Sequence, residues 1–334
     1  PPSDTALASI RTAWHHLINN PEVPTIYGPT AQAAFRAIQL LGGTVVSAKV
    51  LWLILDLATL GLLIGYARTT SRCVARVALL YGWSPLLIVE TAWSAHLEPL
   101  GLLLVVSVIV FVRAKRAIPA GAALAAAAMT KFAPIAVAPI LFRRLGVRKL
   151  ARESGWAFLA ALAVTAALGL LPFLSAGAKM GVGLATYAEH WRFHAGAFSL
   201  IERGFADPLH ARAAVGAMVL AVVAIATWRK FDAERAFLWV IGAGVALSPT
   251  VHPWYVLWLL PIAALRGSLA WLYLSCSVFL AYWGLDTFHA TGEWPEPIGV
   301  RAAIWLPFWG LLALEALRAM RRKDQAIERE PAVS

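Results

Sequence analysis

The sequence predicts an all-α protein that crosses a membrane several times, and three observations lead to that class. Apolar residues make up 60% of the chain and charged residues only 14%, with a mean hydropathy of +0.69. A water-soluble domain is usually about one-quarter charged. Several segments are apolar on every side, and most approach the roughly 20 residues that span a hydrocarbon core about 30 Å thick. Basic residues gather in alternate loops between these segments, as on the cytoplasmic side of a membrane. The apolar segments are 45–66, 74–93, 98–112, 154–174, 213–228, 236–247, 254–265, 269–285 and 302–317.

The basic clusters give the predicted bundle an orientation. They lie at 68–76, 113–116, 143–152, 229–235 and 318–323. The eight histidines lie in or beside the intervening loops, so polar and titratable groups gather on the outer face. A net charge of +11 would suggest nucleic acid in a soluble protein. Here topology and anionic lipid headgroups account for the basic residues, so we expect a lipid bilayer and no nucleic acid as partners.

The chain divides into three predicted parts. Residues 1–44 form an outer-face segment with short interfacial helices at 6–19 and 30–41, the second closed by Gly42 and Gly43. Residues 45–317 form the transmembrane bundle, whose longest outer loop is 175–211. Residues 318–334 form a basic cytoplasmic tail that we expect to be disordered. Pro1–Asp4 resembles the interior of a loop, so we expect one or more spans before it.

The segment Ile118–Phe142 breaks the alternation, because basic clusters flank it on both sides. Two half-helices that enter from the cytoplasm and return would reconcile the charges, since irregular backbone is tolerated at depth where protein surrounds it. One full span that violates the charge rule is the alternative. We favour the hairpin, with Pro134 and Pro139 in its returning arm.

Lys131 is the most informative single residue, because a lysine in the middle of an apolar stretch costs about 2.5–3.5 kcal/mol on insertion scales. Its ammonium group either binds a phosphate at the membrane interface or extends to water, while its apolar stem lies along apolar surroundings. In the long outer loop, Arg203 has the forked geometry that suits phosphate, and Glu202 precedes it. We take Lys131 and Arg203 as candidate phosphate-binding residues and expect them to converge with Glu98 and His252.

Other polar residues lie at the ends of predicted spans. Glu98 opens a helix directly after His96, where the helix dipole alone could stabilise its carboxylate. Recognition of sugar or phosphate is the other interpretation of the pair. Glu90 and Asp56 lie deeper, and we expect Glu90 to have a polar partner.

The segment Ser248–Tyr255 joins two spans through two prolines, which present His252, Trp254 and Tyr255 at the outer interface. An aromatic belt would explain the rings but not the histidine. Sugar rings stack on aromatic faces, so a carbohydrate or lipid-headgroup rim is the functional interpretation.

Metal, nucleotide and hydrolase signatures are weak or absent in the sequence. His190 and His194 would share a helix face and could bind a metal only if that segment were helical, so we expect no metal ligands. Cys73 and Cys276 fit no metal spacing. No G-x-S-x-G, HExxH, Walker or CxxC pattern occurs, which excludes the common soluble hydrolases and nucleotide-binding classes.

Four motifs in order resemble a known family. They are Pro21–Pro29 with the following Gln32 and Phe35; His96-Leu97-Glu98-Pro99; Ala120-Gly121 through Lys131 and Pro134; and Ser248–Tyr255. Together they resemble the bacterial glycosyltransferases of GT-C type that use polyprenyl-phosphate sugars. The resemblance is closest to the family 87 mannosyltransferases and their DUF2029 relatives, and covers nearly the whole chain.

The resemblance implies a GT-C type bundle at the bacterial plasma membrane. It implies inverting transfer of a hexose, mannose by analogy, from a polyprenyl-phosphate donor to a glycan or glycolipid acceptor of the cell envelope. The active site would lie on the outer face and need no cofactor. Tyr27, His96, Glu98, Glu202, His252, Trp254 and Tyr255 would contact the sugar or acceptor. The catalytic base would be an aspartate upstream of Pro1, and Gly28, which replaces a proline of the family motif, should loosen the first outer segment.

Two other classes remain open. A transporter or flippase of polyprenyl-linked sugars would share the apolar bundle and buried lysine, but should show inverted repeats with broken helices in both halves of the chain, and the sequence contains only one broken pair. A non-catalytic subunit is the third interpretation.

Overall fold

The computed structural model describes residues 20–146 and 154–328, and positions 5, 8, 16 and 18; side chains are described up to residue 321. Every regular element in these ranges is a helix, and six helical segments are long and apolar enough to cross a membrane. These findings confirm the all-α membrane class. The main helices are α1 (Pro29–Leu40), α2 (Val45–Thr69), α3 (Val74–Gly82), α5 (Glu98–Arg113), α6 (Ala117–Thr130), α7 (Ala138–Leu145), α8 (Gly155–Leu170), α9 (Lys179–His190), α11 (Pro208–Trp228), α12 (Ala233–Leu247), α15 (Leu269–Ser277) and α17 (Ile298–Glu328). Shorter helical segments are α4 (Pro85–Leu87), η3 (Ile88–Trp93), η4 (Ala133–Val137), η5 (Leu171–Ala176), α10 (Phe198–Ile201), η6 (Glu202–Gly204), α13 (Pro253–Val256), η7 (Leu257–Leu259), α14 (Leu260–Arg266), η8 (Val278–Gly284) and α16 (Leu285–Thr291).

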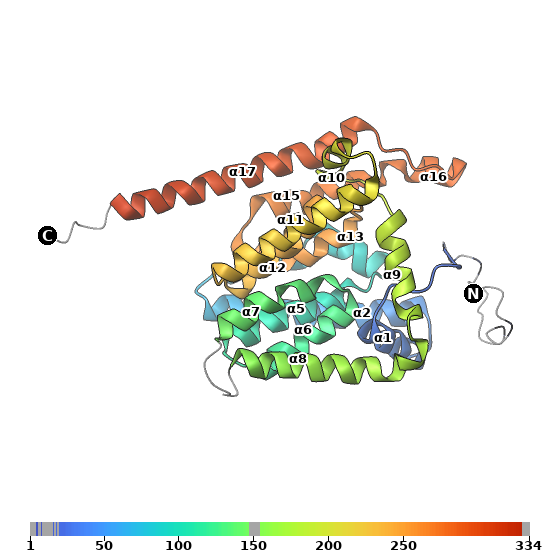
Figure 1. Ribbon diagram of the computed structural model, residues 1–334, viewed down its shortest axis with the longest axis horizontal. Coiled ribbons are helices and arrows are strands. Elements are labelled where there is room, and N and C mark those ends of the chain that lie inside the picture. Colours follow the sequence, from blue (N-terminus) through green and yellow to red (C-terminus); the bar gives the residue numbers. More distant parts are fainter. Residues whose placement is uncertain are drawn as a thin grey trace.

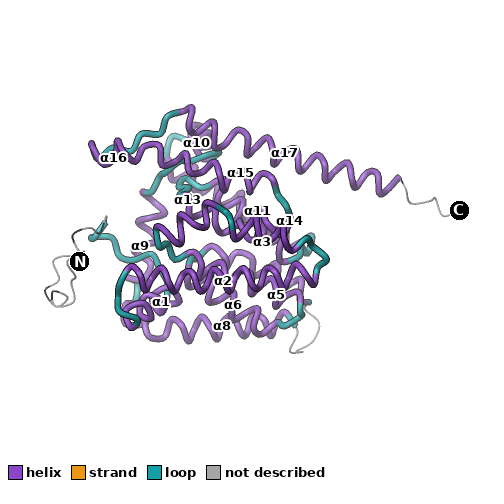
Figure 2. Tube along the Cα trace, turned by 180° about the vertical axis from the view of Figure 1, so that it is seen from behind, coloured by secondary structure: helices purple, strands orange, loops and turns teal. Residues whose placement is uncertain are grey.

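The long helices lie side by side between two chemically different ends of the bundle (Figure 1). We call one the basic end, because it carries the loops at 70–73, 114–116 and 229–232. The other, the histidine end, carries the loops at 94–97 and 248–252 together with α1, α9 and α16. Seen from behind, α2, α5, α6 and α8 form one neighbouring group, and successive members pack against each other (Figure 2).

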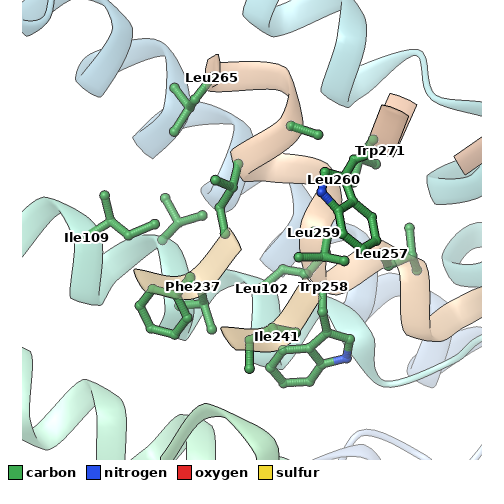
Figure 3. Close-up of a cluster of buried hydrophobic side chains, with 14 of the residues drawn as sticks. Leu102, Ile109, Phe237, Ile241, Leu257, Trp258, Leu259, Leu260, Leu265 and Trp271 are labelled. Carbon is green, nitrogen blue, oxygen red and sulfur yellow. The ribbon is translucent and has the colours of Figure 1, made fainter. Parts of the chain in front are cut away.

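The centre of the bundle is α5 and the segment 253–266, which are surrounded by protein. Leu102 and Ile109 of α5, Phe237 and Ile241 of α12, and Trp258 belong to one cluster of buried apolar side chains (Figure 3). Because lipid tails are as apolar as these side chains, close van der Waals packing stabilises this contact between helices. The helix α5 has 16 residues, fewer than a full span requires, because its neighbours rather than lipid cover it.

The segment 118–142 forms the predicted hairpin. The helix α6 ends at Thr130, Lys131 is extended (φ −141°, ψ 136°), and the chain returns through η4 and α7. Lys115, just before α6, and Arg144, near the end of α7, line the same cavity at the basic end. Both ends of the hairpin therefore lie on one side, and the single straight span is wrong.

The arm α6 packs very closely on α8 because of Gly121. A Cβ atom at this position would lie 2.1 Å from the carbonyl oxygen of Phe158. Only a glycine permits this backbone contact. At about 1.5 Å per residue, the 14 residues of α6 carry Lys131 about 21 Å from the basic end.

The predicted boundaries hold in part. The second short helix is confirmed as α1, and Gly42 and Gly43 follow it with φ of +108° and +63°. The first predicted helix, 6–19, lies mostly outside the described residues. The outer segment 175–211 is not a plain loop, since it contains α9, α10 and η6. The helix α17 continues to Glu328, so the disorder predicted from residue 318 is wrong for residues 318–328: Ala, Met, Arg, Lys, Gln and Glu there are strong helix formers.

Candidate functional site

An ion pair between Lys131 and Glu98 lies at the histidine end. The Lys131 ammonium donates a hydrogen bond to Glu98 Oε1, and the side chains of Lys131 and Glu98 are 18% and 1% exposed. The ammonium also lies 4.8 Å from the centroid of the Tyr255 ring, a favourable cation–π position. The Lys131 ammonium therefore contacts Glu98 and Tyr255 rather than extending to the water at the membrane surface. Glu98 Oε2 is buried with no hydrogen-bond partner among the described residues.

Local structure fixes the Glu98 carboxylate. Glu98 is the first residue of α5, where the helix dipole favours a negative charge. The preceding loop is held by Trp52, whose indole Nε1 donates to the carbonyl oxygen of Ala95 at 3.0 Å. The sequence contains no pattern that marks Trp52 for this task.

Glu90 and Asp56 have the polar partners that a buried carboxylate needs. Tyr282 donates to Glu90 Oε1 at 2.9 Å, and His96 Nε2 lies 3.4 Å from Glu90 Oε2. This confirms the predicted polar partner of Glu90. Asp56 accepts hydrogen bonds from Tyr81 at 3.1 Å and Thr91 at 2.8 Å, which makes it a structural residue of the bundle.

Four rings from three segments of the chain form a continuous stack beside the ion pair. The ring centroids of His96 and Trp254 are 4.1 Å apart, those of Trp254 and His252 are 4.4 Å apart, and those of His252 and Phe193 are 4.4 Å apart. The planes of His252 and Trp254 differ by only 5°. The sequence predicted the first three rings as site residues and missed Phe193. We call these four residues the ring stack.

Backbone hydrogen bonds hold the loops of the ring stack together. The Phe193 N–H donates to the Pro249 carbonyl at 3.1 Å, and the Val251 N–H donates to the Phe193 carbonyl at 2.7 Å. The hydroxyl groups of Tyr187 in α9 and Tyr255 share a hydrogen bond. The outer segment 175–211 thus contributes Tyr187 and Phe193 to the site, although no sequence pattern had indicated either residue.

Tyr27 joins the site through the segment that precedes α1. Burial, and then the negative charge of Glu98, raises the pKa of the Tyr27 phenol to about 12. The neighbouring Gly28 lies against the end of α6, where an added Cβ atom would be 2.5 Å from the carbonyl oxygen of Met129. Gly28 therefore tightens this segment against α6, and the expectation that it loosens the segment is wrong.

Arg203 and Glu202 do not join Lys131. Glu202 pairs with Arg192 at 2.6 Å, and Arg203 is exposed on η6. No hydrogen bond or ion pair among the described residues connects either residue to the site, so the predicted convergence of Arg203 with Lys131, Glu98 and His252 is wrong. The 3-10 turn η6 lies beside α10 and α11 instead.

The two histidines of the outer segment also separate. His190 is exposed at the end of α9, whereas His194 is buried in the next loop with a φ of 44°. The helical spacing that a shared metal would need is therefore broken. Within the described ranges, no group of three His, Cys, Asp or Glu residues could hold a metal ion.

Acid is expected to destabilise the ring stack. Burial, then the charge of Lys131, lowers the pKa of His252 to about 3, and burial lowers the pKa of His96. An unfolded histidine binds a proton near pH 6.5. Since the folded protein does not, its stability falls as pH drops from about 6.5 toward 3.

Between about pH 7 and pH 5, the Tm of His252→Phe should therefore fall less than the Tm of the parent. Intrinsic fluorescence of the protein in detergent measures both values. His289→Phe is the matched control, because His289 is exposed on α16. If the Tm of His252→Phe falls as much in acid as the Tm of the parent, protonation of His252 is not the cause of the loss of stability.

Comparisons with protein families, curated proteins and solved structures found no significant match. The chemistry of the site therefore rests on its own residues. Within the described residues, they place the Lys131 ammonium, the buried carboxylates of Glu98 and Glu90, stacked imidazole and indole rings, and several phenols together at one end of the bundle.

Proposed function

We propose that the protein is a membrane glycosyltransferase that moves a hexose from a polyprenyl-phosphate donor to a cell-envelope acceptor at the outer face. The buried Lys131–Glu98 pair at the histidine end carries the proposal. Buried charges in a membrane bundle are costly and mark functional sites. A cation suits the donor phosphate, and aromatic rings such as Trp254 suit a sugar face.

The proposed reaction is a single displacement with inversion. The acceptor oxygen forms a bond to the anomeric carbon, and the bond from that carbon to the donor phosphate breaks. The acceptor proton passes to a carboxylate base, an aspartate by the family resemblance. Lys131 stabilises the charge that develops on the leaving phosphate, while Glu98 and the imidazole rings bind hydroxyl groups.

Transfer measured in membrane vesicles tests this role. Lys131→Ala in the full-length protein should lower transfer of mannose from a polyprenyl-phosphate donor at least 10-fold, equivalent to about 1.4 kcal/mol of transition-state stabilisation. Lys179→Ala is the control, because Lys179 is exposed at the start of α9. Lys131→Met with Glu98→Gln removes both charges of the pair and should be equally impaired. Undiminished transfer by either Lys131 variant would overturn the proposal.

A transporter of polyprenyl-linked sugars is the second candidate, and the helix interruptions favour it. The helical geometry changes to a π-helix at η3 in the first half of the chain and to a 3-10 helix at η8 in the second half, and Glu90 and Tyr282 join these two segments. Broken helices in both halves are typical of secondary transporters. Counterflow of the labelled donor in proteoliposomes without an acceptor would support this candidate over the transferase.

A further inference from the structure

A polar cavity lies at the basic end, opposite the Lys131 site. Its volume is about 600 Å³, and Tyr66, Arg113, Lys115, Arg144, Asp232 and Glu234 are among its lining residues. These residues come from α2, the end of α5, the hairpin and the start of α12. The proposed transferase reaction uses none of them.

The carboxylates of this cavity already have partners. Glu234 accepts hydrogen bonds from Arg72 at 2.9 Å and Arg266 at 3.3 Å, and Tyr66 also donates to it. Asp232 caps α12 by accepting from the backbone N–H of Arg235 at 2.9 Å. The negative charge at the cavity wall is therefore largely balanced.

The cations at the wall have no such partner. Arg113 donates to the Thr69 carbonyl at 3.1 Å, and Arg144 donates to the Lys230 carbonyl at 3.3 Å. Among the described residues, no carboxylate pairs with Arg113, Lys115 or Arg144. The described lining of the cavity therefore has a net positive charge that fits an anion.

An apolar groove continues from this cavity along the surface of the bundle. It has a volume of about 400 Å³, runs between α2 and α5, and shares Tyr66 and Arg113 with the basic cavity. Gly61 and Gly65 form its floor, and a Cβ atom at either position would meet nothing within 4 Å. Gly61 lies eight residues before the end of α2 at Thr69, so the groove reaches about 12 Å toward the bilayer centre.

We propose that the basic cavity and the groove together bind one anionic phospholipid of the cytoplasmic leaflet. The phosphate lies beside Arg113, Lys115 and Arg144, and an acyl chain lies over Gly61 and Gly65. A soluble anion would need only the cavity, whereas the joined groove at hydrocarbon depth fits a lipid. Basic pockets between transmembrane helices on the cytoplasmic side are suited to anionic headgroups. This site is independent of the proposed transferase activity.

Native mass spectrometry of the full-length protein tests the proposal. After incubation of the detergent-purified protein with equimolar phosphatidylglycerol and phosphatidylcholine, the parent should retain phosphatidylglycerol at least 10-fold over phosphatidylcholine. Lys115→Gln with Arg144→Gln should lower phosphatidylglycerol retention at least 5-fold. Gly65→Leu should lower it similarly, because the new side chain fills the groove without meeting the protein.

Two matched controls separate this site from general lipid binding. Arg36→Gln with Lys179→Gln removes the same charge from exposed residues of α1 and α9 and should leave retention unchanged. Gly216→Leu places the same side chain on α11, where space is also open, and should do likewise. Equal retention of both lipids would overturn the proposal. So would unchanged retention in Gly65→Leu, or displacement of the lipid by inorganic phosphate alone.

Discussion

Lys131→Met is expected to lower the free energy of unfolding by about 3 kcal/mol, because it leaves Glu98 charged and almost fully buried. Adding Glu98→Gln should restore stability to within about 1 kcal/mol of the parent, since an uncharged pair carries no desolvation penalty. Titration with sodium dodecyl sulfate in mixed micelles measures both values.

The pair of Arg192 and Glu202 provides the control for this experiment. Arg192 is 49% exposed, so water screens the interaction and Arg192→Met should cost about 1 kcal/mol or less. Equal losses in Lys131→Met and Arg192→Met would show that burial of the Glu98 charge contributes little. Failure of Glu98→Gln to rescue stability would show that packing of the lysine stem dominates.

Gly121→Leu should destabilise the protein by at least about 3 kcal/mol. The added side chain begins with a Cβ atom 2.1 Å from a backbone carbonyl of α8, so no rotamer relieves the contact and the two helices must separate. Because α6 carries Lys131, the same change should also displace the ammonium from Glu98. Thermal unfolding followed by tryptophan fluorescence measures the loss.

Gly216→Leu is the matched control for Gly121→Leu, since space is open around Gly216. It should unfold within about 0.5 kcal/mol of the parent, as is usual for surface substitutions. A Gly121→Leu variant as stable as this control would show that α6 and α8 do not pack as described.

The sequence predicted the fold class and the hairpin because both follow from long-range regularities. Apolar runs follow from the thickness of the bilayer, and alternating basic clusters follow from the difference between its two sides. Neither pattern depends on which helix packs against which. The same charge pattern identified Ile118–Phe142 as a hairpin, and the structure agrees. The extension of α17 was missed because a charged helix has no apolar signal to follow.

The site was predicted in part, for a related reason. Lys131, Glu98 and His252 are conspicuous because polar groups are expensive inside an apolar bundle. Tyr187 and Phe193 were missed because aromatic residues are ordinary at membrane interfaces. Arg203 was placed wrongly because the sequence of a polar loop does not reveal how its backbone turns. Partner identities such as Tyr282 for Glu90 depend on packing between distant halves of the chain.

The helix α7 returns to the side from which α6 departs, and this return determines how many times the chain has crossed the membrane before α8. A segment that enters and leaves on one side adds no crossing, so it leaves the sidedness of every later helix unchanged. A version of the chain without residues 117–145 would keep α11 and α17 in their present orientations, while a version with a full span there would invert them. The element that carries Lys131 therefore has no effect on the sidedness of the helices that follow it.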